Sequence, residues 1–258
     1  MKTHFKILFL ALLFAGCETI SENDRYIPLD VEHGGRAHVL LEFTGFRCVN
    51  CPAAEQRAGE LKEMYGDNLI IVALHPASNP FTQGKYDYTC PEADSIYLHL
   101  GGNAGTSFPM GNVDIMRYEG NYFMLAGEWT TMIYQAMKQI SAPTLTCTTS
   151  ADKQNPTIVD INVTYSPLED ARVACWLVED SVLGMQAMED GSANDHYYHR
   201  HVLRAAAHHT PWGIPATGTE TDMKIQIPDH CNLAQLSVVA LLIDKKDNHI
   251  INAYEKKL

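Results

Sequence analysis

One stretch of the chain, residues 40–61, constrains the fold more than any other. It reads LLEFTGFRCVNCPAAEQRAGEL: an apolar run of strand length, a Thr-Gly turn, a C-x-x-C pair at Cys48 and Cys51, and a helical pattern that opens with Pro52. The dipole and the free N–H groups at a helix N-terminus favour a thiolate over a thiol. Strand, turn, dithiol and helix in this order are typical of a reactive cysteine pair.

The surrounding residues predict an α/β layer. Two fully apolar runs, HVLLEF and LIIVALH, have the length of strands that are covered on both faces. Between them, apolar residues recur at helical spacing, and Gly66 is a candidate C-cap. A strand, helix, strand order implies a right-handed parallel crossover. Residues 128–140 predict a further helix, which ends before Pro143.

Beyond Pro143 the pattern changes to short strands. TIVDINVTY alternates apolar and polar residues, and ARVACWLVED, DMKIQIP, QLSVVALLID and HIINAYEK are further runs bounded by turn residues. Such strands, without intervening amphipathic helices, predict an immunoglobulin-like β-sandwich. We therefore expect an α/β domain over residues 36–142 and the β-sandwich over 143–258. Residues 183–218 predict an irregular excursion between the early and late strands.

The N-terminus has the pattern of a leader. A short positive region with Lys2 and Lys6 precedes an apolar run too short to span a bilayer permanently, and small residues then lead into Cys17. This pattern resembles the lipobox of bacterial lipoproteins, in which the signal is cut before the cysteine. It predicts a signal peptide over residues 1–16, lipid on Cys17 and a polar tether over 17–35. The alternative is an ordinary secretory signal with an incidental cysteine.

The charge of the chain disfavours one class of partner. Taking Lys2 and Lys6 from the 19 basic residues leaves 17 against 31 acidic ones, a formal charge of −14 after processing. An acidic surface repels the phosphate backbone, so we expect no nucleic-acid partner. No phosphate-binding loop or dinucleotide fingerprint stands out, so we expect no cofactor.

Six cysteines remain beside Cys17, in an exported setting where disulfides persist. The C-x-x-C pair closes locally. For the other four, the sequence allows three pairings or free buried thiols: Cys90, Cys147, Cys175 and Cys231.

Two residues outside the C-x-x-C pair are candidates for its site. Glu42 lies six residues before Cys48 on the apolar strand, where a buried carboxylate would have a raised pKa and could accept a proton from Cys51. The alternative is that Glu42 points to solvent at a sheet edge. Pro109 follows Phe108 and a glycine-rich approach, and the C-x-x-C context favours a cis bond there, whereas trans is the general expectation for a single X-Pro bond.

Residues 37–141 together are similar to the thioredoxin fold. The resemblance rests on the order strand, acid, C-x-x-C, helix, strand, helix and proline turn. It implies that Cys48 attacks, that Cys51 resolves the mixed disulfide, and that Phe108 and Pro109 line the site.

The dithiol departs from that family at four positions. These are Arg47, where an aromatic residue is usual, Val49 and Asn50 in place of Gly-Pro, and Pro52 directly after the second cysteine. Arg47 would lower the pKa of Cys48 and favour an oxidising couple.

A second resemblance covers nearly the whole chain. EFTGFRCVNCPAA, the Phe-Pro turn, the HVLR motif at residues 201–204 and the late strands look like the twenty-eight-kilodalton outer-membrane protein family of lipoproteins. The resemblance implies a thioredoxin-like N-terminal domain, an immunoglobulin-like C-terminal domain and a lipid anchor in the outer membrane. Members are described as adhesins or receptors, which implies a protein or glycan partner without identifying it.

Histidine and tryptophan are concentrated late in the chain. Five histidines could supply metal ligands, because His-x-x-His spacing can chelate: His196, His199, His201, His208 and His209. No carboxylate or cysteine of suitable spacing completes a site, so we expect no metal. Trp176 and Trp212 are expected to pack in or around the core.

Two functions follow from these patterns. The first is an outer-membrane or cell-surface lipoprotein with a binding or adhesion role, in which Cys48 and Cys51 form a structural disulfide. The second is an envelope thiol-disulfide oxidoreductase that uses the same pair, with Glu42 and Pro109 in the site. We favour the first, because Pro52 and the unusual Val-Asn dipeptide weaken the case for an enzyme.

Overall fold

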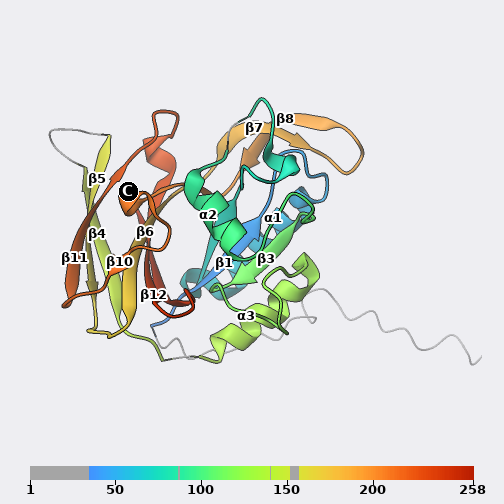
Figure 1. Cartoon of the computed structure of the whole chain (residues 1–258). Helices are drawn as coiled ribbons and strands as arrows, with labels where there is room; N and C mark the ends of the chain where they lie inside the picture. Colours follow the sequence, from blue (N-terminus) through green and yellow to red (C-terminus); the bar gives the residue numbers. More distant parts are fainter. Residues whose placement is uncertain (1–34, 87, 140, 152–156) are drawn as a thin grey trace, which may run out of the picture. The chain divides into compact units, whose positions relative to one another are not determined.

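The computed structural model describes residues 35–86, 88–139, 141–151 and 157–258 (Figure 1). The predicted signal peptide, the lipidation site at Cys17 and nearly all of the tether lie outside the described residues. The described residues form one compact unit of mixed α/β structure that is rich in strands. This agrees with the expected combination of an α/β part and a β part.

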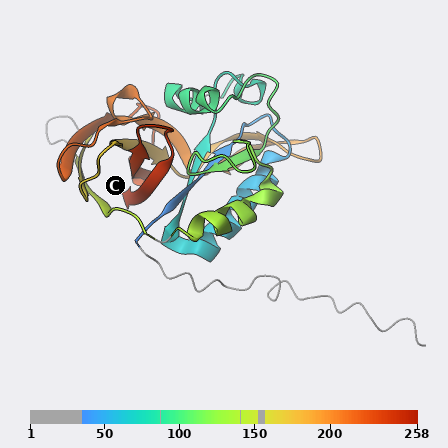
Figure 2. The same ribbon diagram turned by 60° about the horizontal axis from the view of Figure 1, so that its bottom comes forward.

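The α/β part is built around two buried strands, as predicted. Strand β1 is parallel to β2, antiparallel to β3, and fully buried along its length. Helices α1 and α3 cover one face of these strands, and α2 covers the other (Figure 2). The elements are β1 (His38–Phe43), α1 (Cys51–Tyr65), β2 (Leu69–Leu74), α2 (Pro91–His99), β3 (Met110–Val113) and α3 (Trp129–Met137).

The rest of the chain is almost entirely β. Its strands are β4 (Leu145–Ala151), β5 (Ile158–Tyr165), β6 (Ala171–Glu179), β7 (Val182–Ala187), β8 (Ala193–His199), β9 (Val202–Ala206), β10 (Ile214–Pro215), β11 (Glu220–Gln226), β12 (Leu236–Asp244) and β13 (Ile250–Lys257). Strands β11, β5 and β4 form a three-stranded sheet, and β7 and β8 form a two-stranded hairpin. The remaining strands extend the sheet that contains β1.

One sheet crosses the expected domain boundary. Its order is β13-β12-β6-β9-β2-β1-β3, with β10 paired to β6. Strand β9 makes the connection, because it is parallel to β2 through Ala73 and Val202 and antiparallel to β6. The amide N–H of Ala73 also donates to the carbonyl oxygen of His201 at 2.8 Å. The HVLR motif therefore opens the strand that joins the two parts of the sheet, with His201 just before β9 and residues 202–204 within it.

The expectation of an irregular excursion over residues 183–218 was wrong. Most of that stretch forms β7, β8, β9 and the short β10. The sequence pattern does not reveal β8, ANDHYYH, because this strand is exposed along most of its length and therefore shows no apolar alternation.

Strand β6 is buried on both faces and separates two cores. Ala174, Trp176 and Val178 face the core shared with α2, and Cys175 and Leu177 face the three-stranded sheet. Strand β12 alternates in the same way. The proposed boundary at residue 142 falls between α3 and β4 and stays a prediction.

Candidate functional site

The C-x-x-C turn connects β1 to α1. Cys48 and Cys51 form a disulfide, and both residues are only 2% exposed. The turn is tight: the N–H of Cys48 donates to the carbonyl of Gly45, and the N–H of Cys51 donates to the carbonyl of Cys48. Gly45 is required here, because a Cβ at this position would lie 2.6 Å from the carbonyl oxygen of Phe81. The predicted dithiol is thus in place, but it is covered.

The β7–β8 hairpin lies over this turn. The N–H of Ala187 donates to the carbonyl of Phe46, and the side-chain amide of Gln186 donates to the carbonyl of Cys48, both at 2.8 Å. Gln186 is itself buried. The sequence gives no local signal for this contact, because the partners are about 140 residues apart.

Glu42 lies in the centre of the sheet, where β1 is flanked by β2 and β3. Its side chain is buried, which excludes the alternative that it points to solvent at a sheet edge. Within the described part of the chain, its Oε1 atom has no hydrogen-bond partner. Burial, and secondarily the charge of Glu55, raise the pKa of Glu42 well above its usual value.

Glu55 is a second carboxylate at this site, and the sequence analysis missed it. It lies four residues after Cys51, one turn into α1. This helical spacing, which places Glu55 on the same face of the helix as Cys51, was the one signal in the sequence that could have identified it. The Tyr197 hydroxyl donates a hydrogen bond to its carboxylate, and the Arg200 Nε lies 4.0 Å from its Oε1. Burial raises the pKa of Glu55 to about 7, although Tyr197 and Arg200 act in the opposite direction. Helix α1 is therefore linked to the hairpin as well.

The Phe108–Pro109 peptide bond is cis, the form that the C-x-x-C context favoured. It precedes β3, in which Met110 pairs with Phe43 at the end of β1 that leads to the disulfide. Phe108 belongs to the same core cluster as Cys48 and Cys51. The proline turn and the disulfide thus lie at the same end of β1, and a role of Pro109 in chemistry stays a prediction.

A buried cluster of histidine and aromatic side chains lies next to the hairpin. The ring centroids of Tyr88 and His199 are 4.4 Å apart, and those of His75 and His199 are 5.7 Å apart. Neither ring nitrogen of His75 has a partner among the residues that the structure describes. Burial lowers the pKa of His75 well below its usual value and that of His199 to about 4. Both rings are therefore neutral at pH 7.

The five late histidines are not gathered into one site. His196 and His199 lie on β8, His201 follows it, and His208 and His209 lie in the short helix η5 (Ala207–His209). The potential metal ligands that do lie close together among the described residues are Asp244, Asp247 and His249, with ligand atoms within 4.8 Å of one another. That the protein binds no metal stays a prediction.

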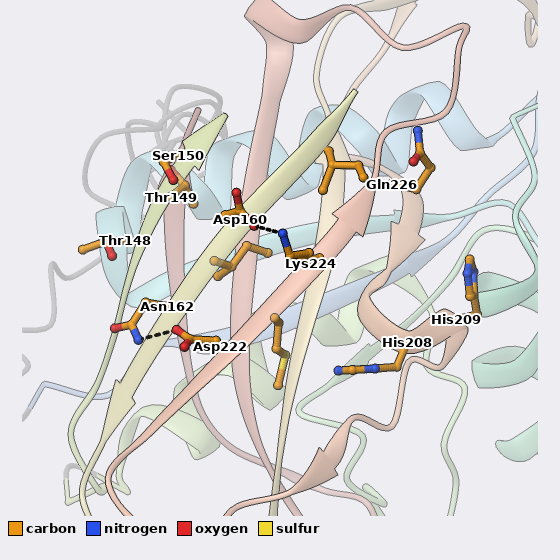
Figure 3. A pocket seen from close by; sticks show the side chains of 13 residues that line it. Thr148, Thr149, Ser150, Asp160, Asn162, His208, His209, Asp222, Lys224 and Gln226 are labelled. Carbon is orange, nitrogen blue, oxygen red and sulfur yellow. Dashed lines mark hydrogen bonds and ion pairs between the residues drawn. The ribbon is translucent and has the colours of Figure 1, made fainter. Parts of the chain in front are cut away.

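A hollow of about 810 Å³ lies over the three-stranded sheet (Figure 3). Two polar pairs lie in its mixed lining: the Nζ of Lys224 is 2.6 Å from a carboxylate oxygen of Asp160, and Asn162 donates to Asp222 at 2.8 Å. His208 and His209 stand at its rim with their rings pointing in different directions.

The four other cysteines among the described residues are free thiols. Cys90 accepts a hydrogen bond from the N–H of Ala93 at the start of α2, and Cys147 and Cys175 lie in the core between β6 and the three-stranded sheet. Cys231 is half-buried, with the Arg204 Nε 3.4 Å from its sulfur. Trp176 is fully buried and Trp212 packs against the core, as expected.

No helix in the described residues is long and apolar enough to cross a membrane.

Comparison with known proteins identifies a family. A crystal structure of a domain of the outer membrane lipoprotein Omp28 from Porphyromonas gingivalis is 14% identical, with a TM-score of 0.31, over 44% of this chain and 87% of that chain. A search of curated proteins found no match. The family model of the outer membrane protein Omp28 matches residues 105–258, more than half of the chain. The chain therefore belongs to the Omp28 family of outer membrane proteins, which confirms the resemblance drawn from its sequence.

Proposed function

We propose that this outer membrane protein is a lipoprotein with a binding role, anchored through lipid on Cys17, and that its C-x-x-C disulfide is structural. Its location follows from the family. We also propose that the protein faces the cell exterior and that its partner is a protein or a glycan.

The burial of the disulfide is the observation that best supports a structural role. Thiol-disulfide exchange requires a thiolate to reach one sulfur of the disulfide. Both cysteines are buried, and the hairpin that lies over them is hydrogen-bonded to the carbonyl of Cys48. In this state, a protein substrate has no direct approach to either sulfur.

The exposed side of the hairpin supports the binding role. Leu183 on β7 and Tyr198 on β8 are directly opposite each other, and each is 54% exposed. An apolar pair exposed to this degree is suited to contact with a protein partner. The hollow beside His208 and His209 combines apolar surface with hydrogen-bonding groups, which suits a glycan instead.

The fold assignment belongs to the proposal as well. We infer a thioredoxin-like domain over residues 36–142, supported by the parallel β1 and β2, the disulfide at the start of α1 and the cis bond before β3. We infer an immunoglobulin-like β-sandwich over 143–258, supported by the packing of β11, β5 and β4 on β6 and β12. Strand β9, between β6 and β2, departs from both folds.

Alkylation of the folded protein tests the structural role. In cells, Cys48 and Cys51 are expected to resist a thiol reagent until the protein is denatured and reduced, because they are bonded and buried. Mass spectrometry of the labelled peptide gives the result. Labelling of either cysteine in untreated cells would contradict a structural role.

One observation favours the oxidoreductase as the second candidate. Glu42 is a buried carboxylate with a raised pKa on the strand that leads into the disulfide, where it could exchange a proton with Cys51. Cys51→Ser is then expected to trap mixed disulfides through Cys48, visible on non-reducing gels and absent from the Cys48→Ser/Cys51→Ser control. Without such adducts this candidate fails.

A further inference from the structure

We propose that the β7–β8 hairpin is coupled to the redox state of Cys48 and Cys51: the disulfide holds the hairpin docked, and reduction to two thiols releases it. The coupling goes beyond the proposed binding role. Release of the hairpin would also move Leu183 and Tyr198, and an effect of this on a partner rests on the proposed binding role.

The hairpin depends on few attachments. Among the described strands, β7 and β8 pair only with each other and belong to neither of the larger sheets. An isolated two-stranded hairpin is marginally stable in water. Beyond its chain continuity with β6 and β9, which pair at its base, its position therefore depends on its contacts with the residues beneath it.

Two of those contacts are made to the C-x-x-C turn itself. The carbonyls of Phe46 and Cys48 accept hydrogen bonds from consecutive residues of β7, Ala187 and Gln186, at 2.8 Å each. The disulfide closes the segment that carries the Cys48 carbonyl, and the Phe46 carbonyl lies in the adjoining turn, which the N–H of Cys48 closes by donating to the carbonyl of Gly45. Reduction removes the covalent closure, and the N–H of Cys51 at 3.3 Å from the carbonyl of Cys48 is a weak replacement.

The other contacts flank the turn. On one side, Tyr197 and Arg200 interact with Glu55 in α1, the helix that begins at Cys51. On the other, Tyr88 packs against both Phe46 and His199. A change in the turn therefore reaches the hairpin through its backbone, through α1 and through the Phe46 ring.

The coupling must be reciprocal. If the disulfide favours the docked hairpin by some factor, docking favours the disulfide by the same factor. Reduction by dithiothreitol breaks the S–S bond and gives two S–H groups, while the reagent loses two electrons and two protons and closes to its cyclic disulfide. Weakening the docking is therefore expected to make reduction easier.

Hydrogen exchange of the whole protein tests the release. In dithiothreitol, the amides of β7 and β8, above all Ala187, are expected to exchange at least about tenfold faster than in the oxidised protein, with β12 unchanged. The Cys48→Ser/Cys51→Ser variant has no disulfide and is expected to exchange like the reduced protein. It therefore tests the release even if dithiothreitol reaches the buried disulfide slowly. Equal exchange of the hairpin in oxidised and variant protein would overturn the proposal, and so would faster exchange across β12.

The reduction equilibrium tests the reverse direction. Gln186→Ala removes the bond to the Cys48 carbonyl and is expected to make the disulfide about tenfold easier to reduce, a rise of about 30 mV for a two-electron couple. Gln226→Ala is the matched control, because Gln226 makes similar side-chain amide bonds to Thr157, far along the chain. Equal potentials in the two variants would overturn the coupling. Neither measurement needs a ligand, so a failure of the binding role leaves both results intact.

Discussion

Gly184 shows how closely the hairpin is fitted to the residues beneath it. A Cβ at this position would collide with the hydroxyl of Tyr88, which is buried. The side chain of Tyr88 is held by contacts with Phe46 and His75 and has little room to move away.

Gly184→Ala is therefore expected to destabilise the protein by about 1–3 kcal/mol, the usual range for an overpacked site. Denaturant unfolding gives the value. Gly59→Ala in α1 is the control, since nothing lies within 4 Å of a Cβ there, and it is expected to be neutral or stabilising by up to about 1 kcal/mol. Equal stability of the two variants would contradict the close fit.

The buried His199 gives the protein a defined response to acid. Its pKa is about 4 when folded, against 6.5 for the free side chain, so between these values the unfolded chain binds a proton that the folded protein does not. Stability from this group is fully present above pH 6.5 and falls by roughly 3 kcal/mol towards pH 4.

The expected result is that the stability of the parent protein relative to His199→Phe decreases as the pH falls from 7 to 4. Urea unfolding at several pH values measures it. The same substitution at exposed His230 controls for the loss of a histidine. A difference that does not change with pH would show that His199 titrates normally.

At the scale of elements, a buried ion pair joins β9 to β6. The Arg204 Nε on β9 lies 3.1 Å from a carboxylate oxygen of Glu179 on β6, and both side chains are buried. The other oxygen of Glu179 accepts a hydrogen bond from the N–H of Asn232 at 2.6 Å.

Arg204→Ala leaves the Glu179 carboxylate buried without its counter-charge, so we expect a loss of about 3–5 kcal/mol. Arg204→Met/Glu179→Met removes both charges and is expected to recover much of that loss. Thermal and denaturant unfolding compare the three proteins. If the single and double variants were equally destabilised, packing rather than the unpaired charge would explain the effect.

The elements that the sequence predicted are those with local signals. Strands β1 and β2 are continuous apolar runs, and the C-x-x-C pair and Glu42 lie within ten residues of each other, so spacing alone placed them. Strand β9 has five residues, one of them a buried arginine, and no periodic pattern. Glu55 and Gln186 acquire their roles only when the hairpin reaches the C-x-x-C turn, a pairing that no local pattern encodes.

At the scale of the whole molecule, the described residues share buried polar contacts as well as one sheet. Asp114, after β3, is buried between Arg36 and His38, and the carbonyl of Asp114 accepts a hydrogen bond from the N–H of Ile250 on β13. Together with β9, this cluster ties the α/β part to the last strand of the chain. Separating the two parts would expose charged groups and unpaired strand edges.

We therefore expect one cooperative unfolding transition rather than two. Trp129 lies in α3 and Trp176 in β6, so fluorescence of the Trp176→Phe and Trp129→Phe variants weights the two parts differently. Under non-reducing conditions, the fluorescence curve and the far-ultraviolet circular dichroism curve of the same variant are expected to have the same midpoint. This comparison is made separately for each variant. If the probes instead separated into two transitions, residues 36–142 and 143–258 would be independently stable domains and the shared sheet would contribute little to cooperativity.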